Sequence, residues 1–442
     1  MHKRILLVQL PTSHLGAGEK VYPLGLARLA STIPPAFERR ALDMNLHPDP
    51  WPGLHRLLAE FQPGVVALSF RNLDPLAGHQ ASYLSVLKTA GLLVRGLLPE
   101  ARILAGGPAF SLFGERLMAE VPQIDIGVVG EGEQVFPRLL EDHPPLAKLP
   151  GILYREGGQV AINPPGERYS LDRLPALDLA AFPPATYSAG NKYVAAMGIE
   201  GKRGCDLCCG YCLYPFLGGG RIRLRHPVAI VDEMERLHRE CGITLFHFTD
   251  PVVNRPADHF DELCRELIRR RLPLSWTGFF REDEVTADNL ALAVRAGLSC
   301  VYFSGDALTE RGLRLLGKKL TPEDIVRASR LTTELGLLTM CHFLVNLPGE
   351  GEAEIAEAGA LLDQLLAIHA PKGNLGAVIF NHVRLYPGAP LTRKLIEGGL
   401  LAADTDLLYP VYYNPLRYNH VLHQLEARCH AAGVFSRLEA IS

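Results

Sequence analysis

The chain contains one short cysteine-rich stretch from which the rest of the sequence is best interpreted: Gly204-Cys205-Asp206-Leu207-Cys208-Cys209-Gly210-Tyr211-Cys212. Three of its cysteines, Cys205, Cys209 and Cys212, have the spacing Cys-x3-Cys-x2-Cys. Thiolate sulfur is the ligand type that holds iron–sulfur clusters. Three cysteines hold three irons of a four-iron cluster, so the fourth iron stays open to bind and reduce a small molecule. We therefore predict that these three cysteines are metal ligands and take part in catalysis.

Two other sites are built from crowded cysteines, a zinc knuckle and a disulfide knot. A tetrahedral zinc site needs four ligands, usually as two pairs separated by a longer segment, whereas the two Cys-x2-Cys pairs here, Cys205/Cys208 and Cys209/Cys212, are adjacent in the chain. The first residues do not resemble a secretory signal, so disulfides are not expected. The cluster interpretation is favoured, and Cys208 is the spare thiol, either packed or facing solvent.

The loop also has an aromatic residue, Tyr211, just before its last cysteine. In this it resembles the cluster loop of radical S-adenosylmethionine (SAM) enzymes. The resemblance implies that the amino and carboxylate groups of SAM chelate the open iron, and that Tyr211 lies at the cofactor.

Length and composition fit a globular enzyme of two or three domains. The 442 residues are 48% hydrophobic and 21% charged, with a formal net charge of -3. That charge gives no general basic surface for nucleic acid or anionic membrane, and no apolar run approaches the ~20 residues of a membrane span. Five further cysteines are scattered along the chain, which suits a reducing cytoplasm. We expect a cytoplasmic protein that neither binds nucleic acid nor spans a membrane.

The first part of the chain alternates short apolar runs with helical segments. The expected strands are residues 5–10, 41–43, 65–69, 102–105 and 126–129. Such alternation predicts a parallel, doubly wound, Rossmann-like α/β sheet. Sheets of this kind bind ligands beyond the carboxyl ends of their strands, and Gly106-Gly107 follows one of those ends.

The order of short motifs in this part resembles the cobalamin-binding domain that precedes one large class of radical SAM enzymes. The matching motifs are Tyr22-Pro23-Leu24-Gly25-Leu26, Ser69 to Asp74, Gly106-Gly107 and Gly130-Glu131-Gly132-Glu133. The resemblance implies a cobalamin-binding domain over residues 1–145. It places cofactor contacts at Ser69, Asn72, Gly106, Gly107 and Glu131.

Two residues are candidates for the position at the lower face of the cobalt. Methionine-synthase-like domains carry Asp-x-His-x-x-Gly, but here the loop has Thr12-Ser13-His14-Leu15-Gly16-Ala17, without the Asp. His14 is therefore either a ligand or an ordinary loop histidine. The Ser-x-Leu element appears as Ser69-Phe70-Arg71, and an arginine has no lone pair to donate to cobalt. Arg71 is either a residue under the corrin that leaves cobalt without a strong lower ligand, or a partner of Asp74.

The prolines at 144–145, 164–165 and 183–184 mark residues 146–190 as a linker, with a small hairpin expected across residues 151–161. Residues 191–385 show six strand–helix steps, too few for a closed eight-stranded barrel. They predict a partial (β/α)6 TIM-like barrel, the open form that radical SAM domains have. Residues 386–442 form a short C-terminal extension with one amphipathic helix over 419–432. Its aromatic stretch, 407–413, either packs under the barrel or lines a pocket with Trp276.

The resemblance also assigns residues at the strand ends of the barrel. Asp250 stands near the SAM amino group, Arg281 near the SAM carboxylate, and Ser304 and Asn346 near the ribose and adenine. Ser304-Gly305-Asp306 replaces the more usual Gly-Ile-Glu-Ser. Lys318 or Lys319 matches a lysine often found after the fourth strand.

The combined resemblance implies a cobalamin-dependent radical SAM methyltransferase with a 4Fe-4S cluster, SAM and cobalamin as cofactors. A deoxyadenosyl radical would activate a carbon that then takes a methyl group from methylcobalamin. The alternatives are polar methyl transfer through cobalamin, a cyclisation or rearrangement without methyl transfer, and a non-catalytic sensor. The expected partners are a small-molecule or peptide substrate and an electron donor such as flavodoxin or ferredoxin.

Overall fold

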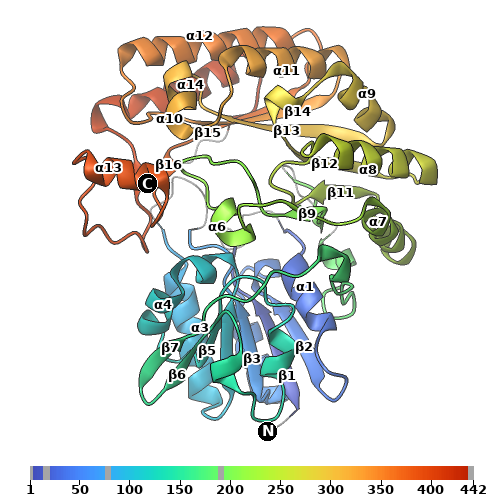
Figure 1. The fold of residues 1–442 in the computed structure, drawn as a ribbon, viewed down its shortest axis with the longest axis vertical. Helices are drawn as coiled ribbons and strands as arrows, with labels where there is room; N and C mark the ends of the chain where they lie inside the picture. Colours follow the sequence, from blue (N-terminus) through green and yellow to red (C-terminus); the bar gives the residue numbers. More distant parts are fainter. Residues whose placement is uncertain (1–2, 13–19, 75–80, 188–193, 437–442) are drawn as a thin grey trace. The chain divides into compact units, whose positions relative to one another are not determined.

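A computed structural model describes residues 3–12, 20–74, 81–187 and 194–436 of the chain (Figure 1). The chain forms two compact units that meet in sequence between Met197 and Gly198. Each unit is organised around its own sheet. None of the helices in these four ranges combines the length and hydropathy that crossing a membrane requires.

The first unit contains a seven-stranded sheet with the strand order β2-β1-β3-β4-β5-β6-β7. Its first five strands are parallel and confirm the predicted Rossmann-like arrangement. They are β1 (Arg4–Gln9), β2 (Glu38–Asp43), β3 (Val65–Ser69), β4 (Arg102–Gly106) and β5 (Ile126–Val128). Most of their residues are buried because helices alternate with the strands along the chain. The main helices are α1 (Leu24–Ser31), α2 (Trp51–Phe61), α3 (Leu84–Leu97) and α4 (Pro108–Glu120).

The expected hairpin is present as β6 (Ile152–Glu156) and β7 (Gln159–Ile162), which pair antiparallel. Strand β6 also pairs antiparallel with β5, so this part of the predicted linker extends the sheet of the first unit. The turn between the two strands contains Gly157 and Gly158, both with positive φ.

The second unit contains a six-stranded open sheet with the order β15-β14-β13-β12-β11-β8. Strands β11 to β15 are parallel neighbours in sequence order, as a partial barrel requires. The strands are β8 (Met197–Ile199), β11 (Leu245–Phe248), β12 (Ser275–Phe280), β13 (Leu298–Asp306), β14 (Leu338–Leu344) and β15 (Leu375–Asn381).

One layer of helices covers this sheet, with neighbouring helices packed side by side (Figure 1). They are α7 (Pro227–Cys241), α8 (Ala257–Arg270), α9 (Ala287–Arg295), α11 (Pro322–Glu334) and α12 (Glu352–His369). Trp276 belongs to β12 and is fully buried; it stacks on Phe280 and donates its indole N–H to the carbonyl of Ala296, which follows α9. Of the two roles open for Trp276, the structure shows packing.

The apolar pattern of residues 377–384 predicts one continuous last strand of the barrel, and this prediction is wrong in part. The strand ends at Asn381, and Val383–Arg384 forms a separate strand, β16, paired with β17 (Tyr412–Tyr413). Helix α13 (Pro390–Glu397) and helix α14 (His420–Ala431) complete the extension. Beyond α14, Phe435 forms a bridge to Ala377 on the outer side of β15.

Candidate functional site

The cysteine loop leaves strand β9 (Lys202–Arg203) and ends at helix α6 (Tyr214–Gly218). It starts at Gly204, where φ is 84° and a Cβ atom would lie 2.2 Å from the carbonyl oxygen of Arg221, so only glycine fits. Backbone bonds then fix both ends of the loop. The Cys205 N–H donates to Gly219 (3.0 Å) and the Cys212 N–H to Cys209 (3.2 Å).

The middle of the loop is attached to two segments that are distant in sequence. The N–H of Gly210 donates to the carbonyl of Leu316 (2.8 Å), at the end of helix α10 (Glu310–Leu316). The carbonyl of Gly210 accepts from the N–H of Leu391 (2.8 Å) in α13. The hydroxyl of Tyr211 donates to the carboxylate of Asp306 at the end of β13. The loop is therefore held in place at the carboxyl end of the sheet.

All three predicted ligands are free thiols in a largely desolvated setting. Cys205 is buried, and Cys209 and Cys212 are half-buried. Burial raises the pKa of each thiol, that of Cys212 to about 12. Nearby thiols add to this rise of the pKa at Cys209 and Cys212, as expected for cysteines that lie close together in one loop. Cys208 is exposed to solvent, as expected for the spare thiol.

Positive charge lies beside these thiols. The Lys318 ammonium lowers the pKa of Cys209 more than any other charge does, and Arg281 acts in the same direction. Three thiolates with cations nearby are the donor set that an anionic iron–sulfur cluster needs, so the residues fit this cofactor. In the described ranges no three His, Cys, Asp or Glu side chains are arranged around a point where one metal ion would fit.

Arg281 follows β12 and enters the same region. Its Nη2 donates to the carbonyl of Lys318 (2.6 Å) and to Asp283 (3.0 Å), and its backbone is held on both sides by the side chain of Asn254. Its Nη1 is buried and has no hydrogen-bond partner within the described part of the chain. A buried, unpaired guanidinium N–H fits a carboxylate, and SAM carries one.

Asp250 has partners within the protein. Its carboxylate accepts from the N–H groups of Gly201 (2.7 Å) and Lys202 (3.1 Å), and the Lys202 ammonium lies 3.9 Å away. Burial raises the pKa of Asp250 to about 6 despite these partners. Asp250 therefore stabilises the turn between β8 and β9. Its contact with the SAM amino group stays a prediction.

The two remaining barrel positions differ. Ser304 lies half-buried within β13, two residues before Asp306. Asn346 has φ of 58°, is buried, and donates to Asn414 (2.8 Å) and to the carbonyl of Tyr418 (2.9 Å). Asn346 therefore links the end of β14 to the C-terminal extension, and a role for its side chain at adenine stays a prediction.

In the first unit, the predicted cobalamin contacts follow the carboxyl ends of parallel strands. Asn72 donates to the carbonyl of Thr12 (2.7 Å), which joins the segments after β1 and β3. Gly107 has φ of 106°, and a Cβ there would lie 2.7 Å from the carbonyl oxygen of Phe70. Gly130 has φ of 84° and open space where a Cβ would stand. Gly107 is therefore required by its close packing on the Phe70 backbone, whereas the open space at Gly130, after β5, leaves room for a bulky ligand and fits a corrin.

The other predicted contacts of this unit are placed as follows. Ser69 ends β3, and its carbonyl accepts from the N–H of Leu10 (3.2 Å). Arg71 is exposed, and its carbonyl accepts from the N–H of Ala109 (3.1 Å). Glu131 forms an ion pair with Arg168 at 3.1 Å. His14 lies outside the described residues.

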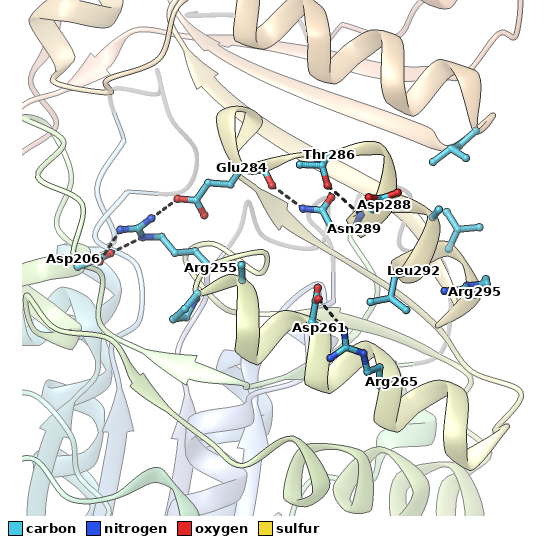
Figure 2. Close-up of a pocket in the computed structure, with 15 residues that line it drawn as sticks. Asp206, Arg255, Asp261, Arg265, Glu284, Thr286, Asp288, Asn289, Leu292 and Arg295 are labelled. Atoms are coloured by element: carbon cyan, nitrogen blue, oxygen red, sulfur yellow. Dashed lines mark hydrogen bonds and ion pairs between the residues drawn. The ribbon is translucent and has the colours of Figure 1, made fainter.

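A pocket of about 1160 Å³ opens on the flank of the second unit, lined mainly by α8, α9 and the turn before α9 (Figure 2). At one end the Arg255 guanidinium pairs with Asp206 (2.8 Å) and with Glu284, as Figure 2 shows. Asp206 is next to Cys205, so the pocket reaches the outer side of the cysteine loop. The predicted SAM contacts do not line it, and the candidate site is placed by the strand-end residues instead.

Sequence reasoning missed two buried residues next to the loop, Glu282 and Lys202. Glu282 is 1% exposed, and neither carboxylate oxygen has a hydrogen-bond partner in the described ranges. It stands in the run Arg281-Glu282-Asp283-Glu284, which is typical of a solvated turn. Lys202 has a nearly fully buried side chain that donates to the carbonyl of Val253 (2.9 Å). No local signal in the sequence marks either residue as buried.

The chain matches two family models, the B12 binding domain over residues 15–140 and the Radical SAM superfamily over residues 199–362. It is 25% identical to an uncharacterized methyltransferase of Pyrococcus horikoshii, over 90% of this chain and 84% of the relative. It is 31% identical to an anaerobic magnesium-protoporphyrin IX monomethyl ester cyclase of Rubrivivax gelatinosus, over 59% of this chain, and spans only about half (48%) of that cyclase.

Among solved structures, the fold is similar to that of the radical SAM methyltransferase TsrM from Kitasatospora setae, solved with tryptophan substrate and a SAM analog bound. The TM-score is 0.74 and the identity 25%, over 97% of this chain and 83% of that one. The matches confirm the family predicted from the cysteine loop and the motifs before it, together with its cofactors, a 4Fe-4S cluster, SAM and cobalamin. The chain belongs to the cobalamin-dependent radical SAM enzymes, a group with methyltransferases among its members.

Proposed function

We propose that the protein is a cobalamin-dependent radical SAM methyltransferase that methylates a poorly activated carbon of a small molecule. One observation carries this proposal: a three-cysteine loop with desolvated thiols is fixed beside a buried arginine whose Nη1 has no protein partner in the described ranges. A B12-binding domain precedes that loop in the same chain. When bound, the cluster supplies reducing electrons for SAM cleavage, and cobalamin supplies a methyl carrier.

The chain's own residues bind and orient these groups. Cys205, Cys209 and Cys212 would hold the cluster, and Arg281 would pair with the SAM carboxylate. Tyr211 is engaged by Asp306, which keeps the loop from turning away from the strand ends. Gly130 would leave backbone open to a corrin. The protein's share of the chemistry is to bind and orient these cofactors, while the cofactors carry out the reaction itself.

One feature bears on how the methyl group moves. Arg71, at the position predicted to lie under the corrin, cannot ligate cobalt. An arginine there is compatible with polar methyl transfer through cobalamin, which is a variant of the same proposal. A cyclisation without methyl transfer is the second candidate, because the chain is 31% identical to a cyclase of Rubrivivax gelatinosus over 59% of its length. The match to a methyltransferase over 90% of this chain favours methyl transfer over it.

The test uses the full chain, purified anaerobically, reconstituted with iron, sulfide and cobalamin, and incubated with SAM and titanium citrate. Deoxyadenosine and S-adenosylhomocysteine are quantified together by mass spectrometry. Both products support radical methyl transfer, and S-adenosylhomocysteine alone supports the polar variant. Deoxyadenosine alone contradicts methyl transfer and favours the cyclisation. Neither product, with cluster and cobalamin bound, leaves two explanations, a missing substrate or a non-catalytic sensor.

The nine cysteines are all free thiols, which is consistent with a reducing compartment. We therefore propose a cytoplasmic location, where a flavodoxin or ferredoxin would supply electrons and where nucleic acid is not a partner. Relatives act on small molecules such as tryptophan, so a small molecule is favoured over a peptide as substrate. Fractionation of the native host, with detection of the protein by antibody, checks the location.

A further inference from the structure

A buried lysine, Lys318, lies between the cysteine loop and the end of strand β13. Lys318 follows α10, and its ammonium lies 2.7 Å from the Oδ2 atom of Asp306. Both side chains are about one-tenth exposed. The neighbouring Lys319 is exposed instead. Of the two lysines that the sequence left open, the structure therefore assigns Lys318 to the site.

Asp306 connects this lysine to the loop that carries the cysteines. Its Oδ2 atom accepts from the Tyr211 hydroxyl as well as from Lys318. Asp306 has φ of 63°, a left-handed conformation that aspartate adopts more readily than most residues. The conformation ends β13 with the carboxylate directed at both partners. One carboxylate thus fixes the cation relative to the loop.

A second carboxylate faces the same lysine without bonding to it. Glu282 lies close to Gly305, whose Cβ would stand 3.4 Å from the Glu282 Oε1 atom. Lys318 is the strongest charge that opposes the effect of burial on the Glu282 carboxyl. Burial lowers the pKa of Lys318, but Asp306, Glu282 and Cys209 together outweigh it, so the pKa is raised and the ammonium stays charged. Lys318 is therefore a buried cation paired with the carboxylate of Asp306.

The charge of Lys318 is close enough to influence the predicted cluster. The backbone just before Lys318 lies against the cysteine loop: the N–H of Gly210 donates to the carbonyl of Leu316 (2.8 Å), and a Cβ at Gly317 would lie 3.4 Å from the carbonyl oxygen of Cys208. A cation held there favours negative charge at the loop's sulfur atoms. A cluster that accepts one electron gains one negative charge, and the net charge around a cluster sets its reduction potential. At an effective dielectric constant of about 20, a unit charge about 10 Å away changes such an equilibrium by on the order of tenfold.

We propose that Lys318 is a positioning residue that makes the cluster easier to reduce, and that Asp306 both holds it in place and moderates its charge. The inference rests on the proposed function, because it requires a cluster at the three cysteines. It assigns opposite effects to two partners in one ion pair. Loss of the cation should make reduction harder, and loss of the carboxylate charge should make it easier.

The experiment is a redox titration of the reconstituted full-length protein without SAM, followed by electron paramagnetic resonance of the reduced cluster. At the potential that half-reduces the wild type, Lys318→Gln should lower the ratio of reduced to oxidised cluster about tenfold, equivalent to 59 mV for one electron. Asp306→Asn should raise that ratio, since asparagine can still accept from Tyr211. Lys318→Arg keeps the charge and should stay close to the wild type.

Lys319→Gln is the matched control, because it removes the same charge one residue away in solvent and should leave the ratio unchanged. Equal effects of Lys318→Gln and Lys319→Gln would overturn the inference. So would shifts in the same direction for Lys318→Gln and Asp306→Asn, which a merely structural role predicts. If Lys318→Gln fails to fold, the inference is tested by Asp306→Asn alone, and an unchanged or lower ratio of reduced to oxidised cluster in that variant would overturn it. A wild-type protein that assembles no cluster would contradict the proposed function, whereas a normal cluster with unshifted variants contradicts only this inference.

Discussion

At the scale of the residue, we predict that three of the four cysteines in one loop are cluster ligands and that the fourth is not. Cys205 is buried and Cys209 and Cys212 are half-buried, whereas Cys208 is exposed. Replacing any one of the three by alanine should remove most of the reconstituted iron, since the cluster loses one of its three protein ligands. Cys208→Ala is the control and should keep the wild-type iron content. Iron and sulfide analysis and the visible absorption of the cluster provide the measurement, and iron loss in Cys208→Ala would contradict the ligand assignment.

Arg281 offers a second test at this scale. Its Nη1 is buried without a protein partner in the described ranges, so a carboxylate of SAM has a free donor there. Arg281→Lys keeps the charge but loses the planar fork, and we expect SAM to bind roughly tenfold more weakly. Equilibrium dialysis with labelled SAM measures this under anaerobic conditions. Arg295→Lys, on the exposed side of α9, is the matched control. Equal affinities of the wild type and Arg281→Lys would contradict a contact with SAM.

Glu282 makes the stability of the protein depend on pH. Burial raises its pKa from 4.5 to about 7. The folded state therefore binds more protons than the unfolded state in this range, and stability falls as the pH rises from about 4.5 to 7. At about 1.4 kcal/mol per pKa unit, the loss is roughly 3 kcal/mol.

Glu282→Gln removes this titration, so its melting temperature relative to the wild type should rise steadily between pH 5 and 7.5. Thermal denaturation of the protein without cofactors, in a series of buffers, provides the measurement. Glu397→Gln changes an exposed glutamate and serves as control. A constant difference between Glu282→Gln and the wild type across that range would show that the carboxyl titrates normally.

At the scale of the element, helix α11 begins with a reciprocal cap beside the turn that contains Glu282. Thr321 accepts from the N–H of Asp324 (3.2 Å), and Asp324 accepts from the N–H of Thr321 (3.0 Å). Thr321→Ala should cost about 1 kcal/mol, because the first turn loses one acceptor. Thr321→Ser keeps the oxygen and should cost less. Denaturant unfolding of both variants measures the difference, and equal costs would show that the hydroxyl is not the stabilising group.

Elements were predictable where burial leaves a pattern in the sequence. Strands β1, β3 and β4 are apolar runs that end in polar or small residues, so their places and the carboxyl edge of the sheet followed directly. The end of β15 did not follow, because Val383 continues the apolar pattern beyond Asn381. The chain leaves the sheet there to pair with Tyr412–Tyr413, a tertiary contact that no local pattern records.

At the scale of the whole molecule, the family and its cofactors were predictable because the ligand spacing and the motif order are local in sequence. The charged residues that surround the thiols could not be predicted in this way. Lys318 and Lys319 look alike in the sequence, and only the turn after α10 decides that one is buried and the other exposed. Glu282 has the appearance of a surface residue within an acidic run. The spacing of the cysteines predicts the ligands from the sequence alone. Which charged residues lie near the site depends on the tertiary fold, so it could not be predicted.

The contact between Phe435 and strand β15 has a consequence for how the protein behaves in concentrated solution. β15 is an outermost strand of its sheet, and the N–H of Val378 donates to the carbonyl of Phe435 (2.9 Å) while the Ser436 hydroxyl donates to the carbonyl of Val378 (2.8 Å). These bonds occupy groups that would otherwise offer a template for another chain. Removing residues 433–442 should therefore cause concentration-dependent association, visible by light scattering, whereas Phe435→Ala should remain monodisperse. Residues distant in sequence from the cysteine loop thus protect the protein against self-association.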